Sequence, residues 1–157
     1  MSRWAYANHP SPSARITFVM NRRPNILLLL ADQHRAESMG YAGNTELHTP
    51  NFDRMAAEGA NFTHCVSTHP VCSPYRACLQ TGRFGHHNGV TWNEENIDTT
   101  MPNLAGHFNH AGYATGYFGK CHLHDRTTAA TIYTPPEWRL NWQHWVGWQN
   151  GHHDHDM

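Results

Sequence analysis

The residues with the clearest potential for chemistry are 72–76, with the sequence Cys-Ser-Pro-Tyr-Arg. Pro74 suits the first turn of a helix, because the N–H group that proline lacks would have no partner there. Gly82 is typical of a helix end. The pattern therefore predicts a short helix that begins near Cys72 and carries the guanidinium of Arg76 one turn further on. Because the positive end of a helix and an arginine both favour anions, Cys72 is a candidate site for anionic chemistry.

Further polar side chains follow two segments that are predicted to be strands. Residues 25–31 form a continuous apolar run, which is typical of a strand covered on both faces in a parallel sheet, and Asp32-Gln33 comes directly after it. Residues 113–118 form a shorter β-like segment, which is followed by Lys120 and His122. Because α/β folds place their sites at the carboxyl ends of parallel strands, these polar residues are candidate site residues.

The segments in between alternate between helical and strand-like patterns. Residues 50–58 predict a helix that is capped by Thr49 and ended by Gly59. Residues 60–66 predict a strand, and residues 102–111 predict another helix. This alternation of helices and strands predicts an α/β fold.

The segment 135–157 differs from the rest of the chain and shows no clean period. The spacing of its four tryptophans, at 138, 142, 145 and 148, would allow one helical face. We expect them to line a core or a pocket, since the absence of basic charge argues against nucleic-acid stacking. The His-Asp run at 152–156 is compatible with a metal site, but adjacent residues rarely converge on one ion. A loop near the substrate pocket is the favoured interpretation of this run.

Composition excludes several classes of function. The chain has 157 residues, enough for one domain with a sizeable core, and its formal net charge of -1 gives no electrostatic case for binding nucleic acid or an anionic membrane. Residues 1–22 lack the apolar segment of a signal peptide, so we expect an N-terminal tail and a cytoplasmic location. The cysteines form no CxxC pair, and Cys65, Cys78 and Cys121 are expected to be packing residues.

Taken together, these segments resemble the sulfatase family within the alkaline-phosphatase-like superfamily. The C-x-P-x-R sequence at 72–76, followed by Thr-Gly-Arg at 81–83, is a highly specific match. The resemblance implies a mixed, mostly parallel sheet flanked by helices, with residues 23–157 forming a truncated, N-terminal portion of the catalytic domain. The other matching segments are Arg23 to Leu27, Asp32-Gln33, Thr49 to Asp53, Gly112-Tyr113 and Gly119 to His122.

The resemblance assigns roles to five residues. It implies that a separate formylglycine-generating enzyme oxidises Cys72 to formylglycine, whose hydrated aldehyde attacks the sulfur of a sulfate monoester. Arg76 would hold the deprotonated oxygen, and Lys120 would bridge the diol and the sulfate. His122 would accept the proton that drives sulfate release. Asn93 resembles a substrate-contacting asparagine in one branch of the family.

The resemblance also implies a divalent cation, held by Asp32, Gln33 and the oxygen derived from Cys72. Calcium is the expected ion. Gln33 stands where many family members have a second aspartate, which resembles the branch of choline-sulfatases and phosphonate monoester hydrolases and leaves magnesium and manganese open. On its own, Asp32 is also compatible with a turn cap, and Gln33 with a simple hydrogen bond.

Three functions remain open at this stage. The first is sulfuric-ester hydrolysis, with a small-molecule or carbohydrate sulfate ester as substrate. The second is a phosphonate monoester or phosphodiester hydrolase of the same superfamily, which Lys120 and His122 disfavour. The third is a non-catalytic, truncated remnant, because the family's catalytic domain is longer than this chain and further ligands lie in its second half. We therefore expect the isolated chain to have negligible activity, and its oligomeric state is left open.

Overall fold

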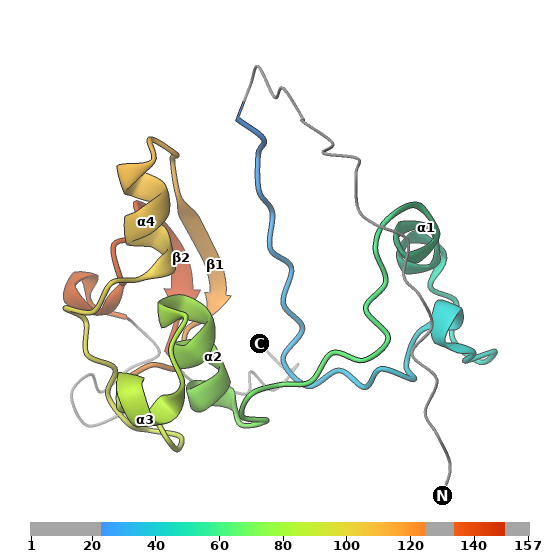
Figure 1. Ribbon diagram of the computed structural model, residues 1–157, viewed down its shortest axis with the longest axis horizontal. Coiled ribbons are helices and arrows are strands. Elements are labelled where there is room, and N and C mark those ends of the chain that lie inside the picture. The colour runs from blue at the N-terminus through green and yellow to red at the C-terminus, as the bar shows by residue number, and fades with distance from the viewer. Residues whose placement is uncertain (1–22, 125–133, 150–157) are drawn as a thin grey trace, which may run out of the picture. The chain divides into compact units, whose positions relative to one another are not determined.

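The computed structural model describes residues 23–124 and 134–149, and it divides the chain into two compact units, 1–33 and 34–157 (Figure 1). The first unit contains the apolar run 25–31, which runs as an extended segment and is not paired in a sheet. Leu27 and Leu29 are 81% and 67% exposed. The prediction of a buried strand is therefore wrong for the described residues. A strand forms only where a neighbour accepts its backbone hydrogen bonds, and none of the described segments pairs with this one.

Within the second unit, the first helix is α1, Pro50–Glu58, as predicted, and it ends at Gly59. Its expected cap is wrong, because the Thr49 hydroxyl makes no capping bond. That hydroxyl instead accepts a hydrogen bond from the backbone N–H of Gly40 at 2.8 Å and donates to Oδ1 of Asp53 at 2.9 Å. These bonds tie α1 to the 3-10 helix η1, Gly40–Ala42.

No strand forms at 60–66, which corrects a second prediction. Phe62 and Val66 are 79% and 89% exposed, and the backbone turns at Thr63 and His64. A turn in the middle of the segment prevents the continuous pairing that a strand requires. Cys65, which was expected to be a packing residue, is exposed as well.

The next helices confirm the predicted pattern more closely. Helix α2 spans Cys72–Thr81 and ends at Gly82, whose φ of 66° lies in the left-handed region that glycine favours. The short helix α3, Gly85–Asn88, follows it. Helix α4 covers Leu104–His110, within the predicted range, and Asn103 caps it by accepting from the N–H of Gly106 at 2.9 Å.

Two parallel strands form the sheet of the second unit. Strand β1, Gly116–Lys120, pairs with β2, His144–Trp148, so that Lys120 lies opposite Trp148. The strand predicted at 113–118 is therefore correct in type but begins and ends later. The tryptophans do not share a helical face: Trp138 lies in the 3-10 helix η2, Pro136–Trp138, and the last two lie in β2. A parallel strand pair with packed helices confirms the α/β class.

The core of the second unit joins α2 to the sheet. Its buried residues are Ala77, Val90, Ile97, Cys121, Leu123 and Leu140. Trp138, Trp142 and Trp145 pack against this core, as expected of them. The indole N–H of Trp142 also donates to Oε1 of Gln80 at 3.1 Å, which fixes the segment leading into β2 against α2. The His-Asp run at 152–156 and the predicted tail 1–22 lie outside the described residues.

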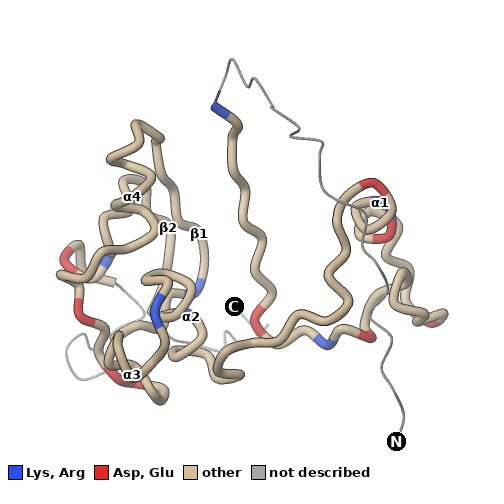
Figure 2. The backbone as a smooth tube through the Cα atoms, in the orientation of Figure 1, with Lys and Arg blue, Asp and Glu red and all other residues tan. Residues whose placement is uncertain are grey.

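Two further features of the described residues are the length of their helices and the distribution of their charged side chains. No helix among them is both long and apolar enough to cross a bilayer. Figure 2 shows that both acidic and basic residues occur along the backbone of the described segments.

Candidate active site

The first turn of α2 presents Cys72, which is half-buried, at the start of the helix. The N–H of Ser73 would have no partner within the helix, and Oδ1 of Asn93 accepts it at 3.0 Å. Asn93 therefore fixes the start of α2 from a loop that follows α3. The hydroxyl of Ser73 is fully buried and has no hydrogen-bond partner among the described residues. The structure thus holds the predicted residues Cys72 and Asn93 next to one another.

Arg76 connects α2 to the end of β1. It is only 7% exposed, and its Nη1 donates to the backbone carbonyl of Lys120 at 2.5 Å. The hydroxyl of Tyr117 donates to the same carbonyl. The structure therefore brings Arg76 and Lys120 together, although the contact uses the backbone of Lys120 and not its ammonium group. This contact fixes the strand end that carries Lys120 and His122 against the helix that carries Cys72.

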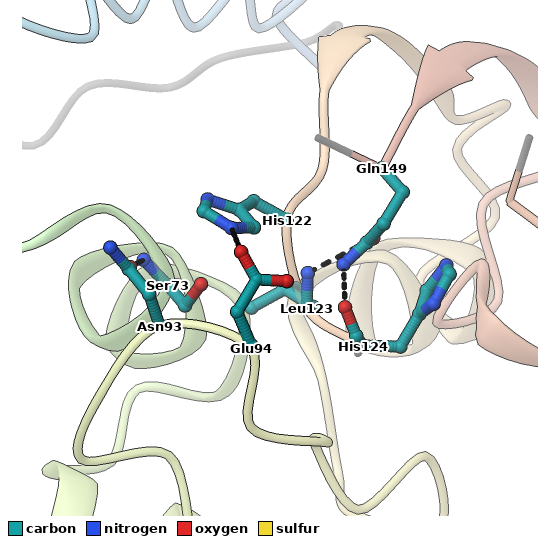
Figure 3. A network of polar contacts seen from close by, with 7 residues as sticks. All are labelled: Ser73, Asn93, Glu94, His122, Leu123, His124 and Gln149. Atoms are coloured by element: carbon teal, nitrogen blue, oxygen red, sulfur yellow. Dashed lines mark hydrogen bonds and ion pairs between the residues drawn. The ribbon is translucent and has the colours of Figure 1, made fainter. Parts of the chain in front are cut away.

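His122 lies just beyond β1 and is 3% exposed, with a positive φ of 56°. Its Nε2 lies 3.3 Å from Oε1 of Glu94, whereas its Nδ1 is buried and has no hydrogen-bond partner among the described residues (Figure 3). Burial lowers the pKa of His122 below its usual value, Lys120 and Arg76 lower it too, and Glu94 acts in the opposite direction. A lowered pKa keeps the imidazole neutral near pH 7, the state that can accept a proton.

Glu94 was not among the site residues predicted from the sequence. The signal available was its place directly after Asn93, in the run Trp92-Asn93-Glu94-Glu95. The two glutamates do different things. The carboxylate of Glu95 accepts from the N–H groups of Thr91 and Trp92 and shapes the loop, whereas Glu94 lies against His122.

The segment beyond β1 is held on both sides of His122. The N–H of Cys121 donates to the carbonyl of Trp148 at 2.7 Å, and the N–H of Leu123 donates to Oε1 of Gln149 at 3.2 Å. The amide nitrogen of Gln149 in turn donates to the carbonyl of His124 (Figure 3). Burial raises the pKa of the Cys121 thiol to about 12, so Cys121 remains a neutral packing residue, as predicted.

The predicted metal ligands Asp32 and Gln33 belong to the first unit, and Cys72 belongs to the second. Within residues 23–124 and 134–149, no three His, Cys, Asp or Glu side chains are grouped so as to hold a metal ion. A carboxylate followed by an amide oxygen nevertheless suits a hard divalent cation. The assignment of these ligands stays a prediction.

Comparisons with known proteins agree with this arrangement. The model of the family described as Sulfatase matches residues 24–157. The chain is 38% identical over 130 residues to the ulvan-active sulfatase of Formosa agariphila, an alignment that covers 83% of this chain and 25% of that protein. The chain thus spans about a quarter of the length of this curated relative.

Solved structures give the same result. A protein of Bacteroides fragilis, solved as a candidate sulfatase, superposes with a TM-score of 0.71 and 29% identity over 77% of this chain and 30% of that one. A second structure, a complex with its substrate D-glucosamine-2-N,6-O-disulfate, has a TM-score of 0.64 and 34% identity over 75% of this chain and 22% of that one. The specific segment 72–83, the strand end at Lys120 and His122, and these matches lead to one conclusion: the chain belongs to the sulfatase family.

Proposed function

We propose that this chain supplies the nucleophile and the proton acceptor of a sulfuric-ester hydrolase. The observation that carries the proposal is the bond from Arg76 to the carbonyl of Lys120, because it holds the start of α2 and the end of β1 together. Cys72 and His122 lie at these two element ends. An acyl- or sulfuryl-transfer site needs a nucleophile and a positioned base within one rigid frame.

Cys72 is the proposed point of modification to formylglycine. Its half-buried position at a helix start, with Pro74 and Arg76 following, fits a group that must carry a negatively charged oxygen. When present, formylglycine would supply an aldehyde hydrate, one oxygen of which would attack sulfur as the alcohol leaves. Loss of the proton of its second hydroxyl would then expel sulfate and restore the aldehyde. The modifying enzyme is thus the proposed protein partner of this chain.

The remaining roles follow from what each side chain can donate or accept. Arg76 donates from Nη1 to the Lys120 carbonyl, and a guanidinium with several N–H donors is suited to hold an anionic oxygen. Asn93 uses Oδ1 on Ser73, and its amide Nδ2 is suited to a substrate oxygen. The ammonium of Lys120 is proposed to bind the sulfate, and His122 to accept the proton that sulfate release gives up.

Asp32, Gln33 and the modified Cys72 side chain are proposed as ligands of a divalent cation. The donor set consists of hard oxygen atoms, which suit calcium first and magnesium or manganese as alternatives. When bound, such a cation would act as a Lewis acid on a sulfate oxygen. Asp32 supplies the negative charge of this donor set, whereas Gln33 adds a neutral oxygen.

The proposed substrate is a carbohydrate or other small-molecule sulfate ester. The solved complex of a family member with a glucosamine disulfate supports a sugar sulfate. Lys120 and His122 support a sulfate ester over a phosphonate, as the sequence resemblance implies. A location in the cytoplasm remains a proposal from sequence.

The test begins with the Cys72 peptide. The chain is co-expressed with a formylglycine-generating enzyme, and its peptides are analysed by mass spectrometry. We expect the thiol of Cys72 to be replaced by an aldehyde, with Cys65, Cys78 and Cys121 unchanged. Cys72→Ala and Arg76→Ala are the matched variants, because both interrupt the C-x-P-x-R sequence. An unmodified thiol at Cys72 after co-expression would contradict the proposal.

A further inference from the structure

We propose that Glu94 is a positioning residue that holds the His122 imidazole with its proton on Nε2, which makes Nδ1 the atom that accepts a proton. The assignment of His122 as proton acceptor rests on the proposed function, whereas the choice of nitrogen rests on the geometry around the ring. Glu94 is not expected to touch the substrate. Its proposed effect on the reaction is exerted through His122.

The two ring nitrogens of His122 have different surroundings. Nε2 lies 3.3 Å from Oε1 of Glu94, and Nδ1 is buried with no hydrogen-bond partner among the described residues (Figure 3). An ionised carboxylate can only accept hydrogen bonds, so the contact requires a hydrogen on Nε2. In a neutral imidazole the other nitrogen then carries the lone pair. The geometry therefore leaves Nδ1 as the basic atom.

Glu94 is held in place by a strained loop. Its φ of 66° lies in the left-handed region, which a residue other than glycine keeps only where neighbouring bonds enforce it. On one side, the carboxylate of Glu95 accepts from the backbone of Thr91 and Trp92. On the other, Asn93 is bonded to Ser73 of α2. These bonds direct Glu94 toward His122.

His122 is fixed in a similar way from its own segment. Its φ is 56°, and the backbone N–H groups of both Cys121 and Leu123 are bonded to the segment that continues β2. The backbone therefore cannot adjust easily, and the orientation of the ring depends on the side chain that contacts it. Among the described residues, Glu94 is the side chain that contacts its nitrogens.

The charged groups that face His122 set the expected direction of its titration. Lys120 and Arg76 lower its pKa, as burial does, and Glu94 raises it through its hydrogen bond and its charge. Removing Glu94 therefore lowers the pKa of His122 further. A base with a lower pKa binds a proton less strongly, and its ring is no longer confined to one tautomer.

The experiment is a nitrogen-15 NMR titration of the chain labelled at histidine. Two-bond proton–nitrogen correlations distinguish the two neutral tautomers, and His122→Gln identifies the signals of His122 by their loss. For the wild type we expect protonation on Nε2 at neutral pH. For Glu94→Gly, which suits the positive φ, we expect a mixture of tautomers and a lower pKa. Glu94→Gln, which keeps the size but not the charge, should also lower the pKa.

Glu58→Gln is the control, because Glu58 is an exposed glutamate of α1 and lies outside the loop that holds Glu94. It should leave the tautomer of His122 unchanged. A wild-type ring protonated on Nδ1, or a Glu94→Gly ring with unchanged tautomer and pKa, would overturn the inference.

Because the isolated chain is expected to have negligible activity, turnover is measured in a full-length sulfatase relative whose matching segment is replaced by this chain and whose Cys72 is converted to formylglycine. The activity of this modified protein on an aryl sulfate gives an independent readout. We expect Glu94→Gly to lower kcat by about tenfold to a hundredfold with little change in KM. The acid limb of its pH profile should move to lower pH, in step with the NMR titration. If the tautomer is as stated but the modified wild type hydrolyses no sulfate ester, the proposed function fails. If hydrolysis occurs with the other tautomer, only the role of Glu94 fails.

Discussion

The carbonyl of Lys120 is the point at which single residues of the helix and the strand meet. It accepts hydrogen bonds from Arg76 and from the hydroxyl of Tyr117. Burial raises the pKa of Tyr117 to about 12, and the nearby Cys121 raises it as well, so this hydroxyl keeps its proton and remains a donor at any physiological pH. The contact is therefore insensitive to pH across the range in which His122 changes charge. The contact between α2 and β1 can therefore persist while His122, the proposed proton acceptor, changes its charge.

Arg76→Lys tests whether the guanidinium both holds the carbonyl of Lys120 and binds an anionic oxygen of the site. A lysine has a single ammonium group and cannot hold the Lys120 carbonyl and an anionic oxygen in the planar geometry of arginine. We expect a loss of about 1–3 kcal/mol in the free energy of unfolding, measured by urea denaturation. Because Arg76→Lys also interrupts the C-x-P-x-R sequence, the formylglycine content of the modified protein is measured by mass spectrometry, and kcat per formylglycine should fall by roughly a hundredfold or more.

Arg83→Lys is the control for that substitution, because Arg83 is exposed and follows the same helix. It should change neither quantity by much. If Arg76→Lys lowered stability but left kcat unchanged, Arg76 would be a structural residue alone.

At the scale of elements, the loop that follows α3 contacts both the start of α2 and the segment beyond β1 through two adjacent residues. Asn93 completes the first turn of α2, and Glu94 contacts the ring of His122. A movement of this loop would therefore shift the start of the helix and the ring together. Helix, loop and strand end behave as one unit, which explains why a short loop carries so much of the site.

Asn93→Ala removes the bond to Ser73 and is expected to cost about 1 kcal/mol in the free energy of unfolding, as capping residues do. Asn103→Ala is a matched control, because Asn103 caps α4 by an equivalent bond of 2.9 Å. Both should lose similar stability, but only Asn93→Ala should lower kcat. Asn93→Asp keeps the acceptor and loses the amide N–H, so a normal kcat for this variant would show that Asn93 does not contact substrate.

Helices were easier to predict from this sequence than strands, for a physical reason. Helix α2 satisfies its hydrogen bonds within itself, so Pro74 and Gly82 suffice to place it. The segments 25–31 and 60–66 could form strands only with a neighbour, and their own residues do not specify one. Candidate site residues could be named where a motif carries them, as with Cys72 and His122, and their roles stay predictions. The contact of Glu94 depends on a backbone with positive φ, which its side chain does not signal.

At the scale of the whole molecule, apolar side chains of the first unit are unusually exposed. Ile26, Leu27, Leu28 and Leu29 are all at least 58% exposed, in a continuous extended segment. Extended apolar segments with unpaired backbone groups readily pair with other chains. The same residues were predicted from sequence to be a buried strand, and their composition is suited to burial and not to water.

The last prediction is therefore that Leu27→Lys combined with Leu29→Lys increases the solubility of the chain. Leu27 and Leu29 are two residues apart in an extended segment, so the two lysines fall on the same face and repel a second copy of the chain. Light scattering and size-exclusion chromatography at increasing concentration should show association of the wild type and less of the variant. Leu47→Lys is the control, since Leu47 is 46% exposed but lies outside the run. If the wild type, the double variant and Leu47→Lys all associated equally, the segment 26–29 would not be the surface through which the chain self-associates.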